Sequence, residues 1–210
     1  MTSHQIPYLL TGLTLAGYWA RVLKMAAKTR RQTGNAANLF PAEPLGRALR
    51  ILWFPAVGLW IVAPFLALLR HPGAGAGAIL RPTEIPLLIS WVAAVGVVMC
   101  LAVSFFCWKR MGKAWRMGIN PDEKTHLVVT GAYAYVRHPI YAISTAMALL
   151  SVVAVPSPAM LSAVLIHVLL LQWESRREEQ YLLQVHGELY HAYCQTVGRF
   201  LPRLRKNAKE

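Results

Sequence analysis

Two polar clusters in this chain hold the residue types that could bind a small charged molecule. The first is the run 131–141, Gly-Ala-Tyr-Ala-Tyr-Val-Arg-His-Pro-Ile-Tyr, which stands directly before a strongly apolar segment. The second begins at Glu178 and Glu179 and continues to Tyr193, just past the next long apolar stretch. One apolar hairpin would bring the two clusters together, so we expect them to form a single site.

The side chains of these clusters suit a ligand that carries several kinds of charge. Arginine and histidine bind carboxylates, glutamate accepts hydrogen bonds from hydroxyl or ammonium groups, and tyrosine rings face cations. If a helix begins at Pro139, His138 lies at its cap, where the helix dipole favours anions, and Tyr141 points into the same mouth. The alternatives are interfacial anchoring for Arg137 and Tyr141, and a solvated charged face for the acidic pair.

The composition indicates that these clusters belong to a membrane protein. Of the 210 residues 56% are hydrophobic and 15% are charged, which departs from the usage of soluble domains. The 22 Lys and Arg residues against 9 Asp and Glu flank apolar runs and do not gather on a soluble face. We therefore expect membrane lipids, and no nucleic acid, as partners.

Four apolar runs could supply the helices that position the clusters: 6–20, 51–69, 85–108 and 140–173. A bilayer core needs about 20 helical residues. The last run is too long for one span and divides at Pro156-Ser157-Pro158. The sequence thus predicts an all-α polytopic membrane protein with about five transmembrane helices, the last two a helical hairpin, and a cytosolic C-terminal helical region that binds a cofactor.

The distribution of Lys and Arg predicts the orientation of these helices. Seven lie in 21–50, six in 109–139 and several in the C-terminal tail, whereas 70–84 holds two and the turn at Pro156 none. Basic residues concentrate on the cytoplasmic side. We therefore expect the N-terminus outside, with the C-terminus and both polar clusters in the cytosol, in a bacterial inner or other cytoplasm-facing membrane.

From Lys113 to Pro202 the chain resembles the isoprenylcysteine carboxyl methyltransferase and phospholipid methyltransferase superfamily of integral membrane enzymes. The segments that carry the resemblance, in family order and spacing, are Gly112-x-x-Trp115, His126 with the lead-in to Gly131-Ala-Tyr133, Arg137-His138-Pro139-x-Tyr141, Glu178-Glu179-x-x-Leu182, Gly187-x-x-Tyr190-x-x-Tyr193 and Arg199-x-x-Pro202. Ala132 replaces the usual Pro, His186 the usual Phe, and Ala142-Ile143 a frequent Gly. These departures bear on the substrate class more than on methyl transfer.

The resemblance implies a methyltransferase that uses S-adenosyl-L-methionine, with a methyltransferase-like region in 111–210. Residues 1–110 carry no motif of the family, and their apolar runs predict three transmembrane helices. The acceptor would be a lipophilic or small molecule bearing a carboxylate, an amine or a thiol. We expect Arg137 to be catalytic by steering an anionic acceptor, although binding the carboxylate of the methyl donor would explain it equally well. The residues expected to bind the cofactor are His126, Gly131, Tyr133, Tyr135, His138, Tyr141, Glu178 and Glu179.

Two other classes of protein stay open. The superfamily architecture also resembles sterol reductases that use NADPH, and the ending Tyr190-x-x-Tyr193-Cys194 is similar to theirs. A non-enzymatic membrane protein with a decayed site is the third possibility. The histidines show no recognised zinc spacing, so no metal is expected. His167 lies inside the fifth predicted helix. We interpret it as a residue that hydrogen-bonds to a neighbouring helix, in preference to a functional role.

Overall fold

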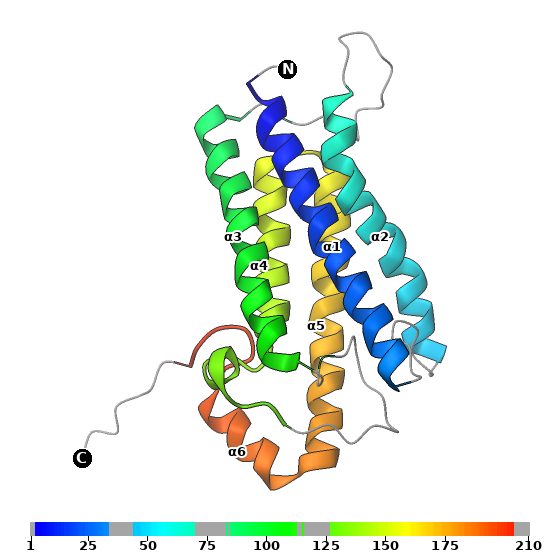
Figure 1. The fold of residues 1–210 in the computed structure, drawn as a ribbon, viewed down its shortest axis with the longest axis vertical. Helices are drawn as coiled ribbons and strands as arrows, with labels where there is room; N and C mark the ends of the chain where they lie inside the picture. Colours follow the sequence, from blue (N-terminus) through cyan, green and yellow to red (C-terminus); the bar gives the residue numbers. More distant parts are fainter. Residues whose placement is uncertain are drawn as a thin grey trace, which may run out of the picture.

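The computed structural model describes residues 3–33, 44–69, 83, 85–112, 115 and 127–203. Within these ranges the chain is all-α, as predicted. The elements are α1 (Gln5–Thr33), α2 (Pro44–Leu68), α3 (Leu87–Met111), a 3-10 turn η3 (Gly131–Ala134), α4 (Pro139–Ala154), α5 (Pro158–His186) and α6 (Glu188–Thr196). The first five helices form an upright bundle, and η3, α6 and the C-terminal segment cover one end of it (Figure 1).

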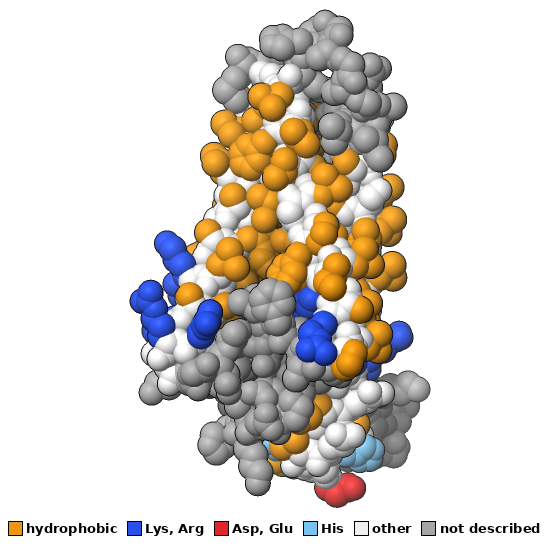
Figure 2. Space-filling model, turned by 90° about the vertical axis from the view of Figure 1, so that its right-hand side faces the viewer, with side chains coloured by type: hydrophobic (Ala, Val, Ile, Leu, Met, Phe, Trp, Pro, Cys, Tyr) orange, Lys and Arg blue, Asp and Glu red, His pale blue; other side chains and the backbone are white. Residues whose placement is uncertain are grey.

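Apolar side chains cover the outside of this bundle as well as its inside. Leu88, Ile51 and Phe106 are each 74% exposed, whereas Trp60, Met147 and Met160 are fully buried. Figure 2 shows hydrophobic side chains over most of the bundle and Lys and Arg side chains near the end that carries the polar cluster. A helix bundle that is apolar on all sides belongs in a lipid bilayer.

Three of the described helices, α2, α3 and α5, are long and apolar enough to cross a membrane, and α4 is a shorter apolar helix. The protein is thus an integral membrane protein with three candidate spans. The first helix is longer than its apolar run, because the basic and alanine-rich sequence after Ala20 continues the helix to Thr33. Its last turns therefore carry Arg30 and Arg31.

The predicted break in the fourth apolar run is confirmed. α4 ends at Ala154, and α5 begins at Pro158 after Ser157, whose side chain accepts a hydrogen bond of 3.2 Å from the backbone nitrogen of Met160. Serine at the cap with proline in the first turn is a strong local start signal. At 29 residues α5 is about 43 Å long, which exceeds the roughly 30 Å of a hydrocarbon core. Its C-terminal half therefore carries polar residues to the site.

Candidate active site at one end of the helix bundle

The two polar clusters meet where α4 begins. His138 is the N-cap residue of α4 and Pro139 occupies its first turn, as the sequence predicts. The His138 ring stacks on Tyr141, with 5.4 Å between ring centroids and parallel planes. Its Nε2 lies 3.2 Å from Glu179 Oε1, and its Nδ1 lies 3.7 Å from Glu178 Oε2. The hairpin of α4 and α5 thus joins the clusters, and this expectation is confirmed.

Glu179 is the centre of a buried ion cluster. Its carboxylate accepts hydrogen bonds from Arg137 Nε at 2.9 Å and from Arg199 Nε at 3.0 Å, and Arg199 Nη2 contacts its second oxygen. Glu179 is 7% exposed, and the Arg137 side chain is 11% exposed. Hydrogen bonds with Glu179 raise the pKa of Arg199. Charge-assisted hydrogen bonds of this kind are strong, and each oxygen of the Glu179 carboxylate accepts at least one of them.

Backbone contacts fix the C-terminal segment against the start of α4. The nitrogens of Arg137 and His138 donate to the carbonyls of Gly198 and Arg199 at 2.8 and 3.0 Å. The Arg137 guanidinium also donates to the carbonyls of Cys194 and Val197. On the opposite side, the Tyr193 hydroxyl donates to the Tyr133 carbonyl. Burial raises the pKa of Tyr193 to about 12, so this hydroxyl keeps its proton at neutral pH.

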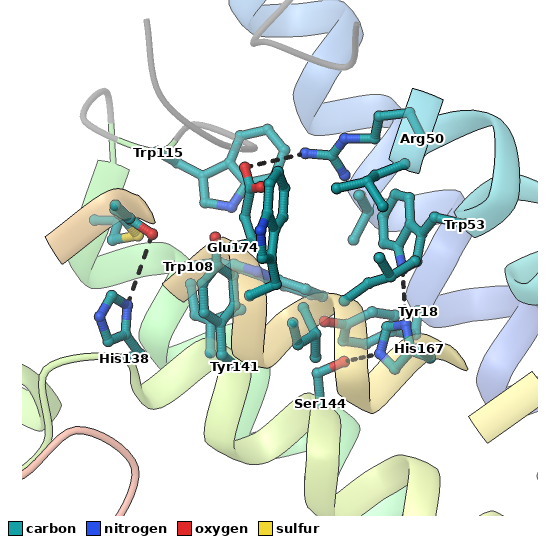
Figure 3. Close-up of a pocket in the computed structure, with 18 of the residues that line it drawn as sticks. Tyr18, Arg50, Trp53, Trp108, Trp115, His138, Tyr141, Ser144, His167 and Glu174 are labelled. Carbon is teal, nitrogen blue, oxygen red and sulfur yellow. Dashed lines mark hydrogen bonds and ion pairs between the residues drawn. The ribbon is translucent and has the colours of Figure 1, made fainter. Parts of the chain in front are cut away.

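A pocket lies beside His138 and extends into the bundle, between α1, α2, α4 and α5. It has about 970 Å³ of empty space, part of it open to solvent. Its wall is rich in aromatic side chains, several of which appear in Figure 3. The aromatic residues that line it are Tyr18, Trp19, Trp53, Trp108, Trp115, Tyr133, Tyr141 and Trp173.

A buried chain of polar groups closes the inner end of the pocket (Figure 3). Trp53 Nε1 donates to His167 Nδ1 at 3.0 Å, and His167 Nε2 lies 3.0 Å from Ser144 Oγ. Because an indole N–H can only donate, Nδ1 is the acceptor, and the neutral ring carries its proton on Nε2. The chain links α2, α5 and α4 in turn. The interpretation of His167 as a bond between helices is therefore confirmed.

A second ion cluster lies on the pocket wall formed by α2 and α5. Glu174 Oε1 lies 3.5 Å from Arg50 Nη2, and Glu174 Oε2 accepts a hydrogen bond of 3.0 Å from Arg177. The Arg50 guanidinium lies over the ring of Trp53, 4.6 Å from its centroid. Among the described residues, no group of His, Cys, Asp or Glu side chains is arranged to hold a metal ion.

The model of the isoprenylcysteine carboxyl methyltransferase family matches residues 91–184, which contain most of α3, all of α4 and most of α5. This segment belongs to that family. The family consists of S-adenosylmethionine-dependent methyltransferases, so the protein is a membrane enzyme that uses S-adenosylmethionine as its methyl donor. No curated protein matches the chain.

The predicted site residues of this family member fall into two groups. Tyr133, Arg137, His138, Tyr141 and Glu178 line the pocket. These five side chains converge on one mouth.

Three other predicted residues, Gly131, Tyr135 and Glu179, do not line the pocket. Glu179 lies behind its wall in the ion cluster, and Tyr135 points outward with 69% of its surface exposed. Gly131 provides a turn with φ of +67°, close to the side chain of Arg110. His126 lies outside the described residues.

The sequence did not indicate several pocket residues of the N-terminal helices. Tyr18 on α1, with Arg50 and Trp53 on α2, lies outside the segment that matches the methyltransferase family. Arg50 stands just before an apolar run, where a basic residue is ordinarily explained as a signal for the orientation of a membrane helix. The high number of tryptophans, seven in 210 residues, is a weak signal that aromatic rings line a cavity.

Proposed function

We propose that this enzyme transfers the methyl group of S-adenosylmethionine to a lipophilic or small acceptor, bearing a carboxylate, an amine or a thiol, at the cytosolic face of the membrane. One observation carries the proposal. An aromatic pocket inside an apolar helix bundle is lined by His138, Tyr141 and Glu178, which lie in the segment that matches the family. A soluble donor and an apolar acceptor can therefore meet there.

The pocket residues fit the donor. Its sulfonium cation suits a wall of aromatic rings, its hydroxyls suit the Glu178 carboxylate, and its adenine suits stacking on a tyrosine or tryptophan. The Glu178 side chain is 31% exposed, so it is open to a ligand from the aqueous side. We assign Tyr133, His138, Tyr141 and Glu178 to donor binding.

The contacts of Glu179 and Arg137 favour a positioning role for both. Arg137 uses its Nε for Glu179 and Nη1 for two backbone carbonyls, so the guanidinium holds the C-terminal segment against His138. The prediction that Arg137 also steers the acceptor stays a prediction. Gly131 supports the pocket wall through its backbone conformation.

When bound, S-adenosylmethionine supplies a methyl group already activated by the sulfonium. The chain then has to align donor and acceptor and exclude water, and orientation alone can contribute about 7–11 kcal/mol. Trp108 and Trp115, which are 4% and 6% exposed, shield the pocket. The acceptor needs only to be deprotonated, so we infer direct transfer without a covalent enzyme intermediate.

We further propose that all five helices of the bundle, α1 to α5, span the membrane, with the N-terminus outside and the pocket mouth in the cytosol. The crowding of basic side chains near the mouth supports this orientation (Figure 2). In this arrangement the three helices of 1–110 and the region 111–210 share one site, since both line the pocket. A lipophilic acceptor would enter sideways from the bilayer, and the donor from the cytosol.

Calorimetry on the purified protein tests the donor. S-adenosylmethionine is expected to bind and NADPH is not, and Glu178→Gln should abolish or strongly weaken donor binding. Glu188→Gln is the control, because the Glu188 side chain is fully exposed. Binding of NADPH alone would refute methyl transfer. Incubating membranes with methyl-labelled donor then identifies the acceptor by whether the label enters the lipid, protein or volatile fraction.

A further inference from the structure

Arg50 and Glu174 form a pair of opposite charges on the pocket wall, away from the family residues at the mouth. They come from α2 and α5, and each side chain is 11% exposed. Both line the pocket, and Figure 3 shows them facing each other beside Trp53 and Trp115. The function proposed above does not use either residue.

Glu174 has an oxygen that the fold leaves without a hydrogen bond. Its Oε2 accepts from Arg177, but Oε1 is buried and accepts no hydrogen bond from the described residues, and Arg50 stands 3.5 Å away as an ion pair. Glu174 as a whole is 8% exposed. A buried acceptor without a donor is costly, and native proteins rarely retain one without a reason. A donor group on a ligand would satisfy it.

The Arg50 guanidinium is held in place by the Trp53 ring, 4.6 Å from the ring centroid. Stacking on an aromatic face holds the planar guanidinium in a fixed orientation, and its fork of N–H donors suits a carboxylate. One cation and one anion 3.5 Å apart are complementary to a zwitterion, in which an ammonium group and a carboxylate stand on the same carbon.

We propose that Arg50 and Glu174 bind the α-amino-acid end of the methyl donor, with Arg50 on its carboxylate and Glu174 Oε1 on its ammonium group. The proposal rests on the proposed function, because it concerns the same donor. It gives the N-terminal helices a role in donor recognition, although Arg50 lies outside the family-matched segment. His138 and Glu178 then bind the rest of the donor molecule.

The test compares two nucleosides by calorimetry on the purified full chain. S-adenosylhomocysteine carries the amino-acid end, and 5′-methylthioadenosine lacks it. Wild-type protein is expected to bind the first at least about tenfold more tightly, as charge-assisted hydrogen bonds predict. Arg50→Gln and Glu174→Gln should each weaken S-adenosylhomocysteine about tenfold or more and change 5′-methylthioadenosine less than twofold.

Arg47→Gln is the matched control, because Arg47 lies one turn earlier on α2, is exposed and does not line the pocket. It should leave both affinities unchanged. An equal loss of both ligands in Arg50→Gln, or no loss of either, overturns the proposal. Equal binding of the two nucleosides to wild-type protein overturns it without any variant. If wild-type protein binds neither nucleoside, the proposed function itself fails.

Discussion

The adjacent carboxylates Glu178 and Glu179 should respond in opposite ways to the same substitution. Neighbouring residues on a helix point about 100° apart. Glu178 therefore faces the pocket with 31% of its side chain exposed, while Glu179 faces two arginines and is 9% exposed. Glu179→Gln is expected to destabilise the protein, and Glu178→Gln to weaken donor binding with little effect on stability.

The size of the destabilisation follows from the contacts of Glu179. Removing one partner of a buried ion pair costs about 3–5 kcal/mol. Arg199 is one-third exposed and water compensates part of its loss, so the lower end, about 3 kcal/mol, applies. For a chain of this length that corresponds to a fall in melting temperature on the order of 5–10 °C. The C-terminal segment 197–203 should also become more sensitive to proteases.

Thermal unfolding in detergent, followed by tryptophan fluorescence, measures the first effect, and calorimetry with S-adenosylhomocysteine measures the second. The pair of variants is its own control, because the chemical change is identical and the positions are adjacent. The reasoning is refuted if Glu179→Gln melts like the wild type, or if Glu178→Gln lowers the melting temperature as much as Glu179→Gln does.

Three further substitutions test the local structure. Gly131→Ala should cost about 1–2 kcal/mol, because residue 131 has a positive φ, whereas Gly58→Ala, at a helical position where an added Cβ meets nothing within 4 Å, should not destabilise the protein; equal losses of melting temperature in the two variants would contradict this. His167→Phe removes the hydrogen-bond partner of Trp53 and Ser144 and should lower the free energy of unfolding by about 2–4 kcal/mol. The control is His191→Phe, at a half-exposed position, which should be close to neutral. Similar melting temperatures of the two variants would argue against the buried polar chain. Tyr193→Phe removes the hydrogen bond to the Tyr133 carbonyl and should lower the free energy of unfolding by about 1 kcal/mol. The control is Tyr135→Phe, at an exposed position, which should leave the free energy of unfolding unchanged. Equal unfolding curves of the two variants would rule out a contribution from that bond.

Features set by local chemistry were predictable from the sequence. The cap at His138 and the turn at Ser157 both depend on a proline in the first helical turn, which acts within a few residues. The meeting of the two polar clusters followed from the length of the apolar run between them. The all-α class followed from the same apolar runs.

Features that depend on packing between distant helices were not predictable. No local signal tells that Arg50 and Trp53 face α5, since a basic residue before an apolar run also marks topology. Nor does a Glu-Glu dipeptide show which side chain faces the cavity, because that depends on how α5 is rotated against its neighbours. Arg137 has the residue type of a ligand-binding group, yet most of its described contacts hold the chain together.

The bonds from the nitrogens of Arg137 and His138 to the carbonyls of Gly198 and Arg199 have a consequence for biogenesis. Gly198 and Arg199 thus hold the backbone of two residues that line the pocket, and both are synthesised after every helix of the bundle. The helices of the bundle can enter the membrane during translation, but this part of the pocket cannot take its final arrangement until residue 199 has left the ribosome. The pocket is therefore completed only after the five helices that surround it have been synthesised.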